Sequence, residues 1–255
     1  MTHRGYAAAP TFSPNGEWIA FRSDASWHGY LNIWTIRVNG TGLHRLTLGR
    51  GDLGADAPAF SANGRWVAFA AESRGGGNEI DRVALSGGHR RVLVPGTSKS
   101  SSYGPTYSPD GRHLAWVQSP EVLRGREVAH IYLGNANGRG GHRLTSGSEP
   151  QFYPDGRSIV FTRERRCTNG TSGSEIAVVS LDTRQQSLVK QACGVDLYAP
   201  TYSPDGAWIA YTIFAGEKSQ LGFVPVPGVT PPYTPLSGLG TDLPVDEVPS
   251  WQPLL

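Results

Sequence analysis

The chain has 255 residues, 23 of them Lys or Arg and 21 Asp or Glu, so its formal net charge is only +2. This balance, without a basic stripe, gives little reason to expect a nucleic-acid partner. Hydrophobic residues make up 38% of the chain, yet no apolar run approaches the roughly 20 residues that span a bilayer. We therefore expect no membrane span, and this chain shows no signal peptide.

Five near-copies of one phrase follow each other along the chain. They read PTFSPNGEWIAF from Pro10, PAFSANGRWVAF from Pro58, PTYSPDGRHLAW from Pro105, PQFYPDGRSIVF from Pro150 and PTYSPDGAWIAY from Pro200. A sixth start, PSWQPLL, begins at Pro249, and the steps between the prolines are 48, 47, 45, 50 and 49 residues. A period of about 40 to 50 residues, built from short strands and tight turns, is typical of a β-propeller blade.

Each repeat predicts four antiparallel strands in the same order. The first strand runs into a type I turn such as Ser108–Gly111, and the second is the apolar run that follows this turn. A variable loop then leads to a third strand, which starts near Asn32, Glu79, His130, Glu175 or Gln220. The fourth strand ends in Leu46-Thr47, Leu93-Val94, Leu144-Thr145, Leu188-Val189 or Leu236-Ser237. Four such strands make one blade.

The whole pattern resembles the TolB-like family, whose repeats place a proline, an aromatic residue and Ser-Pro-Asp-Gly before an Ile-Ala-Phe-like strand. The resemblance implies an all-β fold, a β-propeller with five complete blades plus the ends of a sixth. We expect a single domain over residues 1–255, with units starting near 10, 58, 105, 150 and 200 and a partial closing strand at 249–255. A truncated six-bladed ring is favoured over an open five-bladed one. The N-terminal α/β domain of TolB has no counterpart here.

Both cysteines of the chain, Cys167 and Cys193, fall in the fourth unit. The loop after a blade's second strand and the exit of its fourth strand lie on the same face, so a disulfide between them is sterically plausible. Such a bond would indicate an oxidising compartment. We therefore expect a bacterial protein that is periplasmic or secreted. Two unrelated reduced thiols, and with them a cytoplasmic location, remain the alternative.

Two sets of residues are candidates for a ligand site. The variable loops between second and third strands lie on one face of a propeller, and their most distinctive members are Trp27, His28 and Arg126. The second set stands two residues before each repeat proline, at the start of the innermost strands: Ala8, Asp56, Tyr103, Ser148, Tyr198 and Glu247. Of this set, Asp56, Tyr103, Tyr198 and Glu247 should surround a channel mouth. Solvated loop charges and channel-wall filler are the structural alternatives.

The sequence contains none of the common catalytic motifs. The sequence has no Gly-x-Ser-x-Gly elbow and no His-Glu-x-x-His, and each Asp-Gly pair fits a blade turn better than a calcium site. We therefore expect a non-catalytic protein- or peptide-binding module, with no cofactor and no metal. In the TolB family the channel mouth accepts a segment of a partner. The alternatives are a propeller enzyme (a metal-assisted lyase or hydrolase), an accessory domain of a longer polypeptide, or self-association at an incomplete blade.

Overall fold

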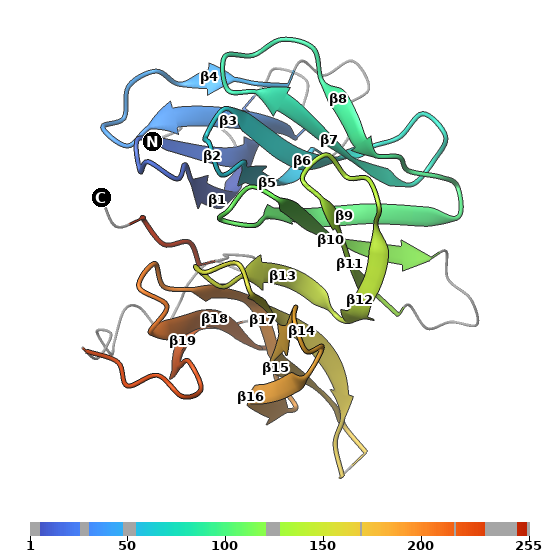
Figure 1. Cartoon of the computed structure of the whole chain (residues 1–255), viewed down its shortest axis with the longest axis vertical. Coiled ribbons are helices and arrows are strands. Elements are labelled where there is room, and N and C mark those ends of the chain that lie inside the picture. Colours follow the sequence, from blue (N-terminus) through green and yellow to red (C-terminus); the bar gives the residue numbers. More distant parts are fainter. Residues whose placement is uncertain are drawn as a thin grey trace. The chain divides into compact units, whose positions relative to one another are not determined.

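The computed structural model describes residues 6–25, 31–47, 55–120, 128–168, 170–216, 218–232 and 249–253. These residues form five antiparallel sheets and contain no helix (Figure 1). The contacts group the sheets into two units, the first reaching to Ser146 and the second starting at Gly147. The all-β class and the antiparallel blades are confirmed, whereas a single domain over 1–255 stays a prediction.

Three four-stranded sheets make up the first unit, and in each the strands follow their order along the chain. The first sheet contains β1 (Ala7–Phe12), β2 (Trp18–Ser23), β3 (Asn32–Arg37) and β4 (His44–Arg45). The second contains β5 (Asp56–Phe60), β6 (Trp66–Glu72), β7 (Asn78–Ala84) and β8 (Arg91–Val94). The third contains β9 (Ser100–Tyr107), β10 (His113–Pro120), β11 (His130–Asn135) and β12 (His142–Ser146).

The second unit holds two sheets of the same kind. The fourth sheet contains β13 (Ser148–Phe152), β14 (Ser158–Arg166), β15 (Ser172–Ser180) and β16 (Gln186–Cys193). The fifth contains β17 (Asp196–Tyr202), β18 (Trp208–Ala215) and β19 (Lys218–Pro225). Its expected fourth strand, ending in Leu236-Ser237, lies outside the described residues.

The turn between first and second strands uses the chemistry that the repeat predicts. In the third sheet, the Gly111 N–H donates to the Ser108 carbonyl at 2.9 Å, and Gly111 has a φ of +70°. The Ser108 hydroxyl donates to Asp110 Oδ1 at 2.5 Å, and the Arg112 N–H donates to the same oxygen at 3.0 Å. These bonds, the Ser108 one first, lower the pKa of the Asp110 carboxyl. The Asp110 carboxylate therefore stabilises the turn.

A β-bulge, which the sequence did not predict, interrupts every first strand. The residue before each repeat proline has a positive φ, between 47° and 56°: Ala9, Ala57, Gly104, Glu149 and Ala199. At each of these places the register with the second strand shifts, so that the proline and the residue before it stand opposite one aromatic residue. A bulge is one of the few positions where a proline fits within a sheet. The repeated proline and the aromatic residue eleven positions later are therefore partners across this bulge.

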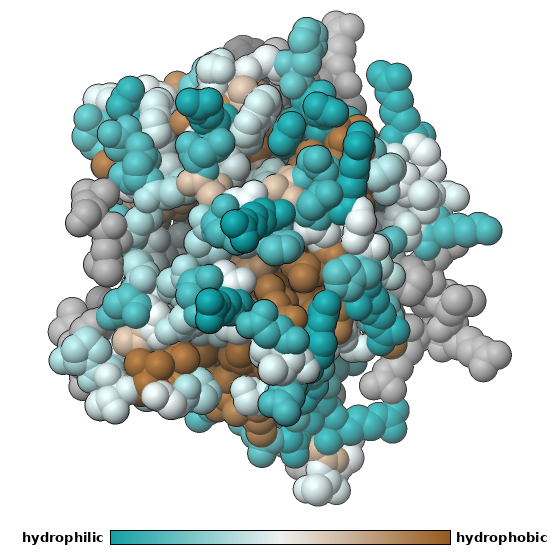
Figure 2. All heavy atoms as spheres, viewed as in Figure 1, coloured by the Kyte–Doolittle hydropathy of each residue, from teal (hydrophilic) through white to brown (hydrophobic). Residues whose placement is uncertain are grey.

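The apolar residues of the second strands form the cores between successive sheets. In the first unit, Phe69 is completely buried between the first and second sheets, and Trp116 is 2% exposed between the second and third. In the second unit, Ile209 and Val160 belong to one cluster between the fourth and fifth sheets. Brown hydrophobic residues are visible over β18 and β19 in Figure 2, at the edge of this cluster.

The end of the chain differs from the expected pattern. Residues 249–253 form no strand, so the ends of a sixth blade are not confirmed. Instead, the Trp251 ring packs edge-on against Phe223 of β19, with the ring centres 6.1 Å apart. Two of the seven residues of PSWQPLL, Pro249 and Pro253, have no N–H and cannot donate to a strand ladder. The repeat resemblance of this segment therefore does not extend to its backbone.

Candidate functional site

The first strands of successive sheets lie side by side. In the first unit β5 packs against both β1 and β9, and in the second unit β13 packs against β17. Each first strand starts beside the end of its second strand, where the variable loop leaves the sheet. Within the described residues, the position two before each of the first five repeat prolines belongs to these first strands. In the first unit this arrangement brings Asp56 and Tyr103 onto neighbouring strands.

Asp56 joins the first and second sheets through an ion pair. Its Oδ2 lies 2.7 Å from the Nη1 of Arg22 on β2, and its Oδ1 accepts the N–H of Ala57, the bulge residue, at 2.5 Å. The Asp56 side chain is 41% exposed and that of Arg22 is 20% exposed. The pair is therefore open to solvent on one side, and a ligand could reach the carboxylate without breaking the fold.

Tyr6 completes this group. The Nη2 of Arg22 donates to the Tyr6 hydroxyl at 3.2 Å, and the guanidinium carbon lies 5.6 Å from the centre of the Tyr6 ring. Burial opposes the positive charge of Arg22, but Asp56 and Tyr6 outweigh it and raise the pKa of the guanidinium. Tyr6 is 43% exposed. We call Tyr6, Arg22 and Asp56 the rim cluster.

Arg22 differs from the residues at the same position of the other repeats. Arg22 stands twelve residues after the repeat proline, and the same position of the other copies holds Ala70, Val117, Thr162 and Thr212. Each of these residues is paired across the strands with the position two before the proline. A lone arginine among alanine, valine and threonine departs from the scaffold pattern.

The two tyrosines predicted to surround a channel mouth, Tyr103 and Tyr198, are half-buried rather than exposed. Tyr103 on β9 stands opposite Val117 and packs against the core cluster that contains Trp116. Tyr198 on β17 stands opposite Thr212, and its hydroxyl lies 3.5 Å from the hydroxyl of Ser219. Both rings are partly buried, so each contributes to its sheet as well as to the surface.

The remaining predicted site residues, Trp27, His28, Arg126 and Glu247, lie outside the described residues. Tyr198 belongs to the second unit, whereas Asp56 and Tyr103 belong to the first. The convergence of all these side chains around one opening therefore stays a prediction. Of these residues, only Asp56 and Tyr103 are shown to lie on neighbouring strands, both in the first unit.

Glu149 is a second residue that breaks the repeat pattern. The other copies have Ala9, Ala57, Gly104 and Ala199 before the proline, and only this one has a long charged side chain. Its Oε2 accepts the hydroxyl of Thr162 at 2.6 Å and the backbone N–H of Ala199 at 2.7 Å. Burial raises the pKa of the Glu149 carboxyl, although these two hydrogen bonds oppose the shift. The side chain thus ties the bulge of β13 to the bulge of β17.

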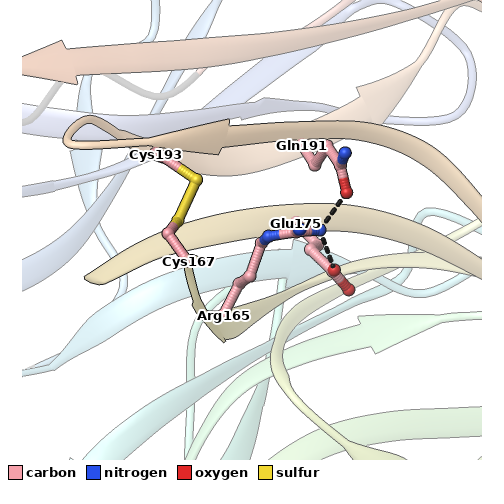
Figure 3. Close-up of a disulfide and its surroundings, with 5 residues drawn as sticks. All are labelled: Arg165, Cys167, Glu175, Gln191 and Cys193. Carbon is pink, nitrogen blue, oxygen red and sulfur yellow. Dashed lines mark hydrogen bonds and ion pairs between the residues drawn. A yellow bond between two sulfur atoms is a disulfide. The ribbon is translucent and has the colours of Figure 1, made fainter. Parts of the chain in front are cut away.

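Cys167 and Cys193 are joined by a disulfide with a Cα–Cα distance of 6.1 Å. The bond links the end of β14 to the end of β16 across the middle strand β15 (Figure 3). Beside it, Arg165 Nη1 donates to Glu175 Oε1 at 3.0 Å and also to Gln191 (Figure 3). The disulfide and this polar group together fasten the outer end of the fourth sheet.

The described residues also bear on metal sites and membrane spans. Within the described ranges, no three or more His, Cys, Asp or Glu residues are arranged to hold a metal ion. Nor does the described part of the chain contain a helix of the length and apolarity that a membrane crossing needs.

The curated relatives that match this chain are Tol-Pal system proteins named TolB. No protein-family model matches the chain. The Tol-Pal system protein TolB of Francisella tularensis subsp. mediasiatica (strain FSC147) is 26% identical over 204 residues, which is 79% of this chain and 45% of that relative. The chain therefore spans less than half the length of the curated relatives that it matches.

Solved structures place the fold in the same group. TolB from Acinetobacter baumannii superimposes with a TM-score of 0.66 at 21% identity, covering 87% of this chain and 52% of that one. A putative TolB from Agrobacterium tumefaciens gives a TM-score of 0.70 at 18% identity, covering 89% and 79%. An oligogalacturonate lyase from Vibrio parahaemolyticus gives 0.61 at 15% identity, covering 88% and 63%. The five repeats, the five antiparallel sheets and these relatives agree that the chain is similar to TolB proteins in sequence and in fold.

Proposed function

We propose that this chain is a non-catalytic module that binds a protein or peptide, with the ligand at the loop-side ends of the first strands. The observation that carries the proposal is the rim cluster. In an otherwise uniform repeat, Arg22 departs from the scaffold pattern and holds Asp56 and Tyr6 in a half-exposed group. Residues on loops and strand ends, held by a rigid scaffold, are where binding sites usually lie.

The chemistry of the rim cluster suits a peptide backbone. Asp56 has a carboxylate oxygen next to solvent that can accept N–H groups, and Arg22 can donate to a carbonyl or carboxylate. Tyrosine and arginine are also the residue types that most often dominate the energy of protein interfaces. Tyr103, on the neighbouring strand, would extend the surface with its ring. Trp27, His28, Arg126, Tyr198 and Glu247 remain the further candidates.

The partner and compartment follow from the relatives and the disulfide. The curated relatives are named as Tol-Pal system proteins, so a protein partner is favoured over nucleic acid. Because disulfides persist in oxidising compartments, the Cys167–Cys193 bond supports a periplasmic or secreted location over a cytoplasmic one. Self-association at an incomplete blade would add a second copy as partner, and gel filtration with light scattering would detect it.

A propeller enzyme remains the alternative function. Its support is the fold likeness to oligogalacturonate lyases, and a fold of this kind hosts many unrelated activities. No residue constellation in the described structure favours this alternative over the binding module, which therefore remains our proposal.

Selection from a random peptide library tests the proposal. Phage displaying random 12-residue peptides would be panned against the immobilised chain, and the affinity of an enriched peptide measured by calorimetry. Arg22→Gln and Tyr6→Ala should each reduce the free energy of binding of that peptide by about 1 to 3 kcal/mol, as loss of an interface anchor does. Val92→Ala is the matched control, because Val92 is 46% exposed on the outer strand β8. Enriched peptides that bind both rim variants as tightly as the unchanged protein would refute the proposed site.

A further inference from the structure

Glu149 has only one of its two carboxylate oxygens in use. Thr162 and Ala199 both donate to Oε2, and the Ser148 hydroxyl lies 3.2 Å from that of Thr162. Since the Thr162 proton points to Glu149, Ser148 is the donor in this second bond. The chain Ser148 to Thr162 to Glu149 fixes the carboxylate firmly. Oε1 accepts no hydrogen bond from the described residues, and Glu149 as a whole is half-buried.

Other carboxylates of the described structure show what Glu149 lacks. Glu79 and Asp81 both pair with Arg90, at 3.4 and 3.0 Å. Glu175 pairs with Arg163 and Arg165, at 2.7 and 3.0 Å. Among the described residues Glu149 has no such ion pair, although burial raises its pKa. A carboxylate removed from water normally has a countercharge, because burial without one is costly.

Glu149 lies on a first strand, the kind of strand on which the proposed function places the ligand. Glu149 lies on β13, at the bulge one residue after Ser148, and bridges to the bulge of β17 one residue after Tyr198. In the first unit Asp56 stands one position earlier in its copy of the repeat, and its carboxylate has Arg22 as its countercharge. In the copy that contains Glu149, the position of Arg22 is taken by Thr162, which donates a hydrogen bond to Glu149 and has no charge.

We propose that Glu149 receives a cationic group of the ligand, the ammonium of a lysine or the guanidinium of an arginine in a bound peptide. Oε1 accepts from the cation while Thr162 and Ala199 hold Oε2 in place. The ligand's positive charge supplies the ion pair that Glu149 lacks among the described residues. Tyr198 precedes Ala199 on β17, and we expect its ring to contact the aliphatic part of such a side chain. This inference rests on the proposed peptide-binding function and adds the chemistry of one ligand residue.

The matched variant is Glu149→Gln. The glutamine carbonyl oxygen can accept both hydrogen bonds of Oε2, so the fold should be kept, and only the negative charge is lost. Asp182→Asn serves as the control, because Asp182 is exposed in the turn between β15 and β16, at the other end of the fourth sheet. Thermal unfolding of both variants would establish that each is folded before binding is measured.

The experiment pans the same random 12-residue library on the unchanged protein and on Glu149→Gln. We expect one lysine or arginine position to be enriched on the unchanged protein and on Asp182→Asn, and to be lost on Glu149→Gln. Replacing the enriched lysine by norleucine in a synthetic peptide should weaken binding to the unchanged protein by about tenfold or more, as close charge pairs across interfaces do. The same replacement should leave binding to Glu149→Gln nearly unchanged, which isolates the pair in a double-mutant cycle.

Three outcomes overturn the inference and separate it from the proposed function. Glu149 does not receive a cation if the enriched peptides carry no basic position. The same follows if the norleucine replacement weakens peptide binding equally for the unchanged protein and for Glu149→Gln. If peptides respond to Arg22→Gln and Tyr6→Ala but not to Glu149→Gln, the proposed function stands and this inference falls. If no peptide is enriched on any of the proteins, both fall together.

Discussion

Replacing Cys167 and Cys193 together by alanine should lower the free energy of unfolding by about 3.5 kcal/mol at 25 °C. The magnitude follows from the loop that the disulfide closes, since the two cysteines are 26 residues apart. Closing a loop of that length removes about 12 cal/mol/K of chain entropy from the unfolded state. The folded state should change little, because the backbone pairing between Gly173 and position 193 does not need the cysteine side chain. Strand β15 also stays paired with β14 on one side and β16 on the other.

Urea unfolding followed by tryptophan fluorescence is the assay. The double alanine variant should unfold at lower urea, with a slightly larger dependence on urea, because its unfolded chain is less compact. A reductant should shift the unchanged protein towards the variant and leave the variant itself unaffected. A loss below about 1 kcal/mol would refute the loop-entropy reasoning that gives the larger value. Two titratable thiols in native protein purified without reductant would refute the disulfide itself.

The backbone and the charge of the first strands give two further predictions. Gly104→Ala should cost about 1 kcal/mol, because a Cβ there meets only Val117 at 3.8 Å and the cost is therefore the strain of its φ of +56°. The reverse change, Ala57→Gly, should be neutral or stabilising, and equal losses in both variants by urea unfolding would contradict the bulge. Because burial raises the pKa of Glu149 in the folded state, its contribution to stability is present at low pH and is lost as pH rises through the raised value. Glu149→Gln should therefore gain stability relative to the unchanged protein as the pH goes from acid to neutral, and a gap between their urea midpoints that does not depend on pH would contradict this.

The sequence predicts the turns and the strand order well because both are local. Ser108, Asp110 and Gly111 contact one another within four residues, so the residue types that the turn needs appear side by side in the sequence. The burial of Phe69 and Phe161 follows from the same repetition, since the second strand of each copy carries an apolar run. These features required no knowledge of which sheets are neighbours.

The bulges and the rim cluster could not be predicted in the same way. Alanine at Ala57 gives no local sign of a positive φ, because it is glycine that usually marks such a position. The contact of Arg22 with Asp56 joins two repeats across 34 positions of sequence, and so does the bond between Glu149 and Ala199 across 50. Comparing the copies position by position would have exposed Arg22 and Glu149 as departures, but not their partners.

The most direct test of the binding account maps where an enriched peptide sits. Backbone amide signals of the isotope-labelled chain would be followed by NMR as a synthetic library-selected peptide is added. We expect the largest shifts at Tyr6, Arg22, Asp56 and Ala57, and a dissociation constant weakened by the Arg22→Gln change. Shifts confined to the outer strands β8 and β16, with the same affinity for Arg22→Gln, would contradict a ligand site at the first strands.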